Sequence, residues 1–267
     1  MPLFHLILIA ALQGVTEFLP ISSSGHLILL PALTGLDDQG KVIDMAVHVG
    51  TLSAVILYFW ADVRLALIGL PRALIGRRDT EGEKLAFLLV IATIPVVIFG
   101  LILNLTGLDD AMRSITVIGW TMLLFGIVLY WADQAGKTDR SATDWNLRDA
   151  LMMGLWQAVA LIPGTSRSGI TITSARVMGY ARSDAAKLSM LMSIPVIIAG
   201  GVLLAGETMY QADAAVLRDG ATAAGFAFVA ALLALTLMMR LLRSISFTPY
   251  VIYRVILGIV LLAIAYS

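Results

Sequence analysis

Long apolar runs, separated by short polar segments, make up most of the chain. A membrane-spanning helix needs about 20 mostly apolar residues, within a range of about 17–25. Six runs come close to or meet that length, and they cover residues 43–60, 85–103, 115–131, 185–205, 223–242 and 251–266. Two of them end in aromatic residues at Trp60 and Trp131, which is typical of a membrane–water interface. We therefore predict six membrane-spanning helices.

Two further apolar regions are interrupted by polar residues. The first consists of the runs 3–19 and 27–33 around the polar stretch 13–26, and the second consists of 150–162 and 172–180 around 163–171. Glycine and proline lie within both polar stretches, and the run after each stretch is too short to span. Irregular backbone at membrane depth is tolerated where protein or a water-filled cavity surrounds it. This pattern predicts two re-entrant helical hairpins, with a kinked spanning helix as the alternative for each.

The two halves of the chain look like repeats. Setting Pro20 against Pro163 aligns the residues that follow them, although identity is weak. One hairpin and three spans make an odd number of crossings, so the second copy must be inverted relative to the first. The predicted fold is therefore an all-α polytopic membrane protein, a single domain over 1–267, with inverted-topology repeats over roughly 1–132 and 148–267.

The distribution of basic residues gives the predicted orientation. If the loop 61–84 is cytoplasmic, most of the 18 lysines and arginines fall on that side of the membrane. The positive-inside rule favours this arrangement. The first hairpin would then open to the outside and the second to the cytoplasm.

The composition of the chain argues against several classes of protein, partner and chemistry. Hydrophobic residues make up 59% of the chain and charged residues only 13%, against about 25% in soluble domains. The net charge is zero, so nothing in the overall charge favours nucleic acid as a partner. Cysteine is absent, which removes disulfides and thiolate chemistry.

Glu17 and Gln13 are the first candidate site residues. A carboxylate at membrane depth usually marks function, although a capped helix end is the alternative. Gln13 lies four residues earlier, so a helix would place both side chains on one face. Such a pair could bind a divalent cation together with a phosphate oxygen.

Three consecutive serines, Ser22, Ser23 and Ser24, follow in the first polar stretch. Serine is a good helix N-cap, and the N–H groups at a helix start also favour a phosphate. A serine nucleophile needs a base nearby, and His26 lies three residues after Ser23. A lone histidine is often structural, so both interpretations of His26 stay open. His48, in the middle of a predicted span, is a weaker candidate that we expect to be hydrogen-bonded within the bundle.

Arg167 dominates the second polar stretch. A guanidinium at membrane depth needs an anionic partner, and its planar fork matches phosphate oxygens. Four hydroxyl side chains surround it in sequence and are candidate phosphate ligands: Thr165, Ser166, Ser168 and Thr171. The alternative is a structural ion pair between Arg167 and Glu17. The lysine of a P-loop is missing, which disfavours nucleotide chemistry.

Two motifs in these stretches resemble those of a known family. Gln13-x-x-x-Glu17, continuing to His26, looks like an (E/Q)xxxE motif, and residues 163–171 look like PGxSRSxxT. Both motifs, their separation, the chain length and the hydropathy layout are similar to those of the BacA-type undecaprenyl-pyrophosphate phosphatases. Gln13 stands where many members carry glutamate, which puts a two-carboxylate metal site in doubt.

The resemblance implies a multi-pass enzyme of the bacterial inner membrane with its active site facing the periplasm. It would hydrolyse undecaprenyl diphosphate to undecaprenyl phosphate and inorganic phosphate, which recycles the lipid carrier of peptidoglycan synthesis and confers bacitracin resistance. The resemblance also implies Mg²⁺ or Ca²⁺ at Glu17 and Gln13, and Arg167 as a diphosphate clamp. Either Ser23 or His26 would attack or assist attack. It leaves a homodimer open.

A transporter is the main alternative. Inverted repeats with broken helices at the midplane are also typical of carriers, and a carrier of a prenyl phosphate would need the same anion site. Glu17 and His26 discriminate between the two functions, because a carrier needs Arg167 but has less need of an acid–base pair.

Overall fold

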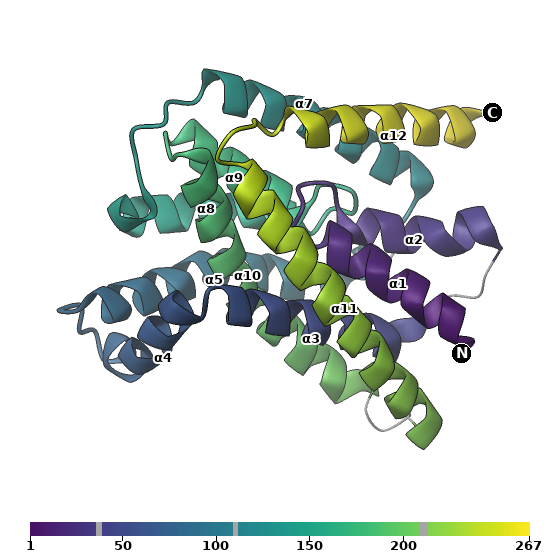
Figure 1. Ribbon diagram of the computed structural model, residues 1–267, viewed down its shortest axis with the longest axis horizontal. Helices are drawn as coiled ribbons and strands as arrows, with labels where there is room; N and C mark the ends of the chain where they lie inside the picture. Colours follow the sequence, from purple (N-terminus) through teal and green to yellow (C-terminus); the bar gives the residue numbers. More distant parts are fainter. Residues whose placement is uncertain (36–38, 109–111, 209–212) are drawn as a thin grey trace.

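The structure, a computed structural model, describes residues 1–35, 39–108, 112–208 and 213–267, and these ranges form helices and no β-strand (Figure 1). Six helices are long and apolar enough to cross a membrane, which confirms the predicted number. They are α3 (Gly40–Tyr58), α5 (Glu81–Thr106), α7 (Ile115–Ala135), α10 (Arg182–Thr208), α11 (Ala214–Leu241) and α12 (Thr248–Tyr266). Their outer surfaces carry exposed Ile98, Leu233 and Ile259, as expected of helices that face lipid. The protein is thus a multi-pass membrane protein.

Two pairs of shorter helices lie where the sequence predicted interrupted regions. The first pair is α1 (Leu3–Thr16) and α2 (Ser23–Thr34), and the second is α8 (Leu147–Val159) and α9 (Arg167–Val177). In Figure 1 the turns after α1 and α8 lie near each other at the centre of the molecule. The interruption of both regions is therefore confirmed, whereas their re-entry into the membrane and the inverted repeat stay predictions.

Each short pair packs against a long helix from the other half of the chain. Helix α1 contacts α11, and α8 contacts α5. Glycine permits both approaches: a Cβ at Gly14 would lie 2.6 Å from the Cβ of Ala230, and one at Gly154 would lie 2.5 Å from the carbonyl oxygen of Ala92. The two halves are consequently interlocked, and the core runs across both.

The segment 61–84, which connects the first two predicted spans, includes most of the helix α4 (Trp60–Leu74). This helix packs against α5, and a Cβ at Gly69 would lie only 2.3 Å from the carbonyl carbon of Gly82. Arg72 Nε donates to Glu83 Oε1 at 2.9 Å, which ties the end of α4 to the start of α5. This connection can be helical because a helix needs only one apolar stripe when a neighbouring helix covers it.

An enclosed charge cluster lies between α7 and the turn after α9. Arg176 is completely buried, and its Nε donates to Asp133 Oδ1 at 3.0 Å. The other nitrogens of Arg176 donate to the main-chain carbonyls of Asp133, Gly136, Lys137 and Tyr180. Arg182 Nε reaches the same Asp133 oxygen at 2.8 Å. The short 3₁₀ helix η1 (Ala142–Asp144) follows in the connection from α7 to α8.

Candidate active site

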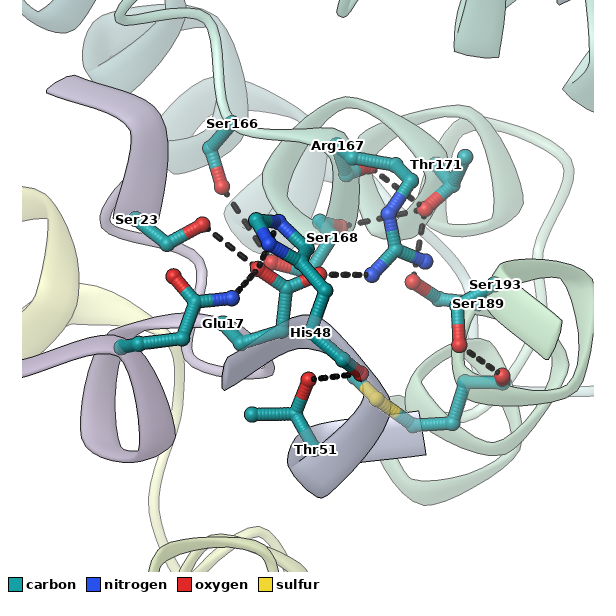
Figure 2. Close-up of polar contacts among 12 residues, drawn as sticks. Glu17, Ser23, His48, Thr51, Ser166, Arg167, Ser168, Thr171, Ser189 and Ser193 are labelled. Atoms are coloured by element: carbon teal, nitrogen blue, oxygen red, sulfur yellow. Dashed lines mark hydrogen bonds and ion pairs between the residues drawn. The ribbon is translucent and has the colours of Figure 1, made fainter. Parts of the chain in front are cut away.

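Glu17 is the point at which the two helix pairs meet (Figure 2). Its Oε1 accepts a hydrogen bond from Arg167 Nη2 at 2.6 Å, although 150 positions separate the two residues in the sequence. Its Oε2 accepts from Ser23 Oγ at 2.6 Å and from Gln13 Nε2 at 2.9 Å. The side chain of Glu17 is 5% exposed. The structure therefore brings together four residues that the sequence singled out from two distant stretches.

A sharp turn before α2 and before α9 aims their first residues at this carboxylate. Ser22 and Ser166 have φ values of 74° and 73°, which are uncommon for residues other than glycine. The Oγ of each accepts from the backbone N–H three residues later, at 3.3 Å in α2 and 3.1 Å in α9. Ser22 and Ser166 are thus helix N-caps, and the next residues, Ser23 and Arg167, are the ones that reach Glu17.

The matching caps correct the alignment of the two halves. Setting Pro20 against Pro163 pairs Ser22 with Thr165, but the cap geometry pairs Ser22 with Ser166, one residue further on. The same shift sets Gln13 against Gln157, and both of these side chains are completely buried.

Four predicted phosphate ligands take supporting positions around the centre, namely Ser24, Ser168, Thr165 and Thr171. Ser168 Oγ donates to the carbonyl of Leu19 at 2.9 Å, and Thr171 Oγ1 shares a hydrogen bond of 2.6 Å with Ser189 Oγ. Thr165 Oγ1 is buried and has no hydrogen-bond partner among the described residues. Ser24 is exposed, and its Oγ lies 3.4 Å from Ser22 Oγ. Ser168 and Thr171 therefore stabilise the region of the two turns before α2 and α9. None of these four hydroxyls bonds to Glu17.

His26 is held against the C-terminal helix. Its Nδ1 lies 2.6 Å from the carbonyl of Ser22, and its Nε2 lies 2.5 Å from the hydroxyl of Tyr253 on α12. A carbonyl only accepts, so Nδ1 carries a proton, and in the neutral ring Nε2 accepts from Tyr253. The His26 ring also stacks on the Tyr253 ring. Both ring nitrogens are engaged, and neither bonds to Ser23 or Glu17.

His48 occupies the position beside Glu17 instead. Its Nδ1 lies 2.7 Å from the carbonyl of Asp44, which again requires a proton on Nδ1. In the neutral ring, Nε2 is then an unprotonated nitrogen, and it lies 3.9 Å from Glu17 Oε2. The side chain is 38% exposed, toward the cavity described below. The expected hydrogen bond within the bundle is present, but sequence reasoning underestimated how close His48 lies to the centre.

A cavity of about 600 Å³ opens from this centre between α3 and α10. Its polar end is formed by Glu17, His48 and Arg167, with Asp44 nearby. The rest of its wall is apolar and includes Leu52, Val196, Ile198, Val202 and Leu204. One end of the cavity therefore suits an anionic group, and the remainder suits a hydrocarbon chain.

A divalent cation fits this centre as a partner of a bound phosphate. Gln13 Oε1 is buried without a hydrogen-bond partner among the described residues, and Nε2 of the same amide donates to Glu17 Oε2. The described part of the chain has no group of three His, Cys, Asp or Glu side chains placed to bind a metal. Mg²⁺ typically uses one or two carboxylates together with substrate phosphates. Glu17 and Gln13 thus suit an ion that arrives with a diphosphate rather than one held by protein alone.

Two residues of α12, Tyr253 and Arg254, also contact the region of the turns before α2 and α9. They were not singled out from the sequence. Tyr253 bonds to His26, and Arg254 bonds to main-chain carbonyls of both turns. The signal for Arg254 was present, because a guanidinium in the middle of an apolar span is as unusual as Arg167 is.

Known proteins resemble this chain along its whole length. The family model described as "Bacitracin resistance protein BacA" matches residues 6–260. A relative from Ruegeria pomeroyi, named undecaprenyl-diphosphatase, is 72% identical over 267 residues and covers all of both chains. Relatives with the same name from Jannaschia sp. and Chromohalobacter salexigens are 69% identical over all of both chains and 45% identical over 97% of each. By both measures the chain belongs to the BacA family.

Proposed function

We propose that this chain is an undecaprenyl-diphosphatase, which hydrolyses undecaprenyl diphosphate to undecaprenyl phosphate and inorganic phosphate. Full-length relatives carry this name, at up to 72% identity among those compared. The contact of Ser23 and Arg167 with one carboxylate, Glu17, is the observation that supports the chemistry. A hydroxyl, a proton acceptor and a guanidinium are what phosphoryl transfer to water through a serine requires.

In the first step, Ser23 Oγ gives its proton to Glu17 and attacks the terminal phosphorus. The new Oγ–P bond forms as the bond from that phosphorus to the bridging oxygen breaks, and undecaprenyl phosphate leaves with the bridging oxygen. The hydrogen bond of 2.6 Å from Ser23 Oγ to Glu17 supports this direction of proton transfer. Arg167 would bind the phosphoryl oxygens through the guanidinium nitrogens that Glu17 does not use.

In the second step, a water molecule attacks the phosphoserine. His48 Nε2 takes a proton from that water and later releases it to solvent, the Oγ–P bond breaks, and Glu17 returns its proton to Ser23 Oγ. The position of Nε2, 3.9 Å from Glu17 on the cavity side, supports His48 as this base. His26 would act through the first turn of α2 rather than on the phosphate, because both of its nitrogens are engaged elsewhere.

Glu17 and Gln13 would hold Mg²⁺ or Ca²⁺ with the diphosphate. The cation would neutralise charge on the phosphate oxygens. The buried, unpartnered oxygen of Gln13 supports this assignment.

The cavity between α3 and α10 suits the prenyl chain, with the diphosphate at the end formed by Glu17 and Arg167. An enzyme of this kind would lie in the bacterial inner membrane with its centre open to the periplasm, where it would return carrier lipid to peptidoglycan synthesis. Removal of the diphosphate would also deprive bacitracin of its target. The equivalent caps of α2 and α9 support the two re-entrant hairpins and the inverted repeat that this arrangement needs.

Phosphate release from undecaprenyl diphosphate by the purified protein in detergent tests the proposal. The wild type should release phosphate, a chelator should stop the release, and added Mg²⁺ or Ca²⁺ should restore it. Arg243→Ala, which changes an exposed arginine, is the matched control for the loss of positive charge in Arg167→Ala. Absence of phosphate release by the folded wild type with either cation would overturn the assignment.

A carrier of prenyl phosphate remains the second candidate, because the broken helices and the cavity suit one as well. A carrier would move prenyl phosphate across vesicle membranes when Ser23→Ala has removed hydrolysis. An enzyme without carrier activity would move none, in the wild type or the variant.

A further inference from the structure

Arg254 is a charged side chain that the proposed reaction does not use. It lies in α12, within a helix that is otherwise apolar at its centre, and it is completely buried. Burial of a guanidinium is costly unless partners replace the water it loses. No carboxylate lies within ion-pair distance of Arg254 among the described residues. The partners must therefore be neutral, and their positions show what the charge stabilises.

The guanidinium joins the two turns that precede α2 and α9. Nη1 donates to the carbonyl of Pro20 at 3.2 Å, in the turn before α2. Nη2 donates to the carbonyls of Gly164 at 3.2 Å and Thr165 at 2.8 Å, in the turn before α9. Two weaker bonds, to Thr121 at 3.4 Å and Met122 at 3.3 Å, attach the same group to α7. The side chain of Arg254, in α12, thus connects the turn before α2 and the turn before α9 to each other and to α7.

These carbonyls belong to the peptides that set the unusual turns. Thr165 immediately precedes Ser166, and Pro20 lies two residues before Ser22, the two residues with positive φ. Such a backbone conformation persists only where the surroundings hold it. Rotation of either turn would redirect Ser23 or Arg167 away from Glu17.

The positive charge of Arg254 is also uncompensated, whereas Glu17 and Arg167 neutralise each other. Arg254 lies directly behind the first turn of α9, because a Cβ at Gly169 would be 2.7 Å from its Nη1. The N-termini of α2 and α9 add their own partial positive charge beside the two turns. An anion bound there would experience the field of all three groups.

We infer that Arg254 is a positioning residue that holds both turns so that Ser23 and Arg167 face Glu17, and that its charge strengthens diphosphate binding. The inference rests on the proposed function. Two variants separate the positioning of the turns from the effect of the charge. Arg254→Lys keeps the charge but cannot reach both turns, and Arg254→Gln loses the charge as well.

The test measures kcat with undecaprenyl diphosphate and the Kd of inorganic pyrophosphate by calorimetry, both per folded molecule. Arg254→Lys should lose about 100-fold in kcat, the effect expected of a displacement of about 1 Å, and keep the pyrophosphate Kd within about threefold. Arg254→Gln should lose as much in kcat and bind pyrophosphate about tenfold more weakly. Arg176→Lys is the matched control, since Arg176 is equally buried and also donates to carbonyls but lies in the enclosed cluster. It should lower stability and leave both quantities near the wild-type values.

Wild-type kcat in both Arg254 variants, or a loss no larger than that of Arg176→Lys, would overturn the inference while the proposed function stands. If the wild type releases no phosphate, the proposed function fails, and the pyrophosphate Kd values still decide the role of the charge. If the Arg254 variants do not fold, Gly126→Ala replaces them, because its Cβ would lie 3.2 Å from the Cβ of Arg254 and displace that side chain slightly. This variant should lower kcat severalfold, and an unchanged kcat would count against the inference.

Discussion

Two buried ion pairs in this protein are alike in type and opposite in their surroundings. Arg176 and Asp133 form the enclosed pair, with side chains that are each 1% exposed. Arg167 and Glu17 form the pair beside the cavity, with side chains 14% and 5% exposed. Arg176 uses all three of its nitrogens on Asp133 and main-chain carbonyls, whereas Arg167 makes one hydrogen bond through its guanidinium within the described ranges. Unused donors that face a cavity therefore distinguish an arginine that can bind a ligand from one that holds the fold together.

The pair beside the cavity should control activity, and this is the largest effect we expect. Arg167→Ala and Glu17→Ala should each reduce phosphate release by about 10³-fold or more, because each removes a group that contacts the reacting phosphate or its nucleophile. Thermal unfolding in detergent should change little compared with variants of the enclosed pair. Phosphate release by both variants at the wild-type rate would reduce Glu17 and Arg167 to a structural pair.

The enclosed pair should control stability. Asp133→Asn leaves the buried cation of Arg176 without its carboxylate, and we expect a loss of about 3–5 kcal/mol in the free energy of unfolding. The kcat of the protein that remains folded should be close to that of the wild type. A large fall in kcat at wild-type stability would contradict the separation of the two pairs.

The serines beside Glu17 should differ from each other. Ser23→Ala removes the hydroxyl that bonds to Glu17 and should lower kcat by at least about 10²-fold, whereas Ser24→Ala changes an exposed hydroxyl and should cost less than about threefold. Phosphate release from undecaprenyl diphosphate measures both. Equal activities would remove Ser23 as the nucleophile.

The two histidines nearest to Glu17, His26 and His48, should respond differently to substitution. His48→Gln should lower kcat by about 10²-fold, because an amide nitrogen does not accept a proton from water. His5→Gln, at a buried histidine of α1 outside the site, is the control. An unchanged kcat in His48→Gln would exclude it as the base, and an equal loss of kcat in His26→Gln would restore the role predicted for His26 from the sequence.

The smallest effect concerns Tyr180, which borders the enclosed cluster outside the spanning helices. Burial, followed by the hydrogen bond of 2.6 Å to Asp149, raises the pKa of Tyr180 well above its ordinary value of 10.0. The raised pKa means that the folded state keeps the proton, so its contribution to stability is present below pH 10.0 and is lost as the pH rises above that value. Tyr180→Phe should be less stable at pH 8 by about 1–2 kcal/mol and show a smaller loss of stability above pH 10 in thermal unfolding. A wild type and variant with parallel pH curves would contradict this assignment.

Much of the site followed from local sequence. Gln13 and Glu17 had to share a face once α1 was helical, and Arg167 needed an anionic partner wherever it lay in the membrane. The contact between Arg167 and Glu17 is the ion pair that the sequence left open as the alternative for Arg167. The choice between His26 and His48 did not follow, because it depends on which way each ring points. That direction is set by Tyr253 and by the carbonyls of Ser22 and Asp44, contacts that spacing along the chain does not reveal.

The sequence by itself determined the membrane class, the six spanning helices and the positions of the two breaks, because the transfer of each residue into lipid depends mainly on that residue and its near neighbours. It also determined which charged side chains the fold had to accommodate. Only the tertiary structure decided that Ser22 and Ser166 are caps, that Ser23 and Arg167 reach Glu17, and that Arg254 holds both turns. These roles depend on backbone direction at two turns and on contacts between residues up to 234 positions apart, which no local pattern encodes.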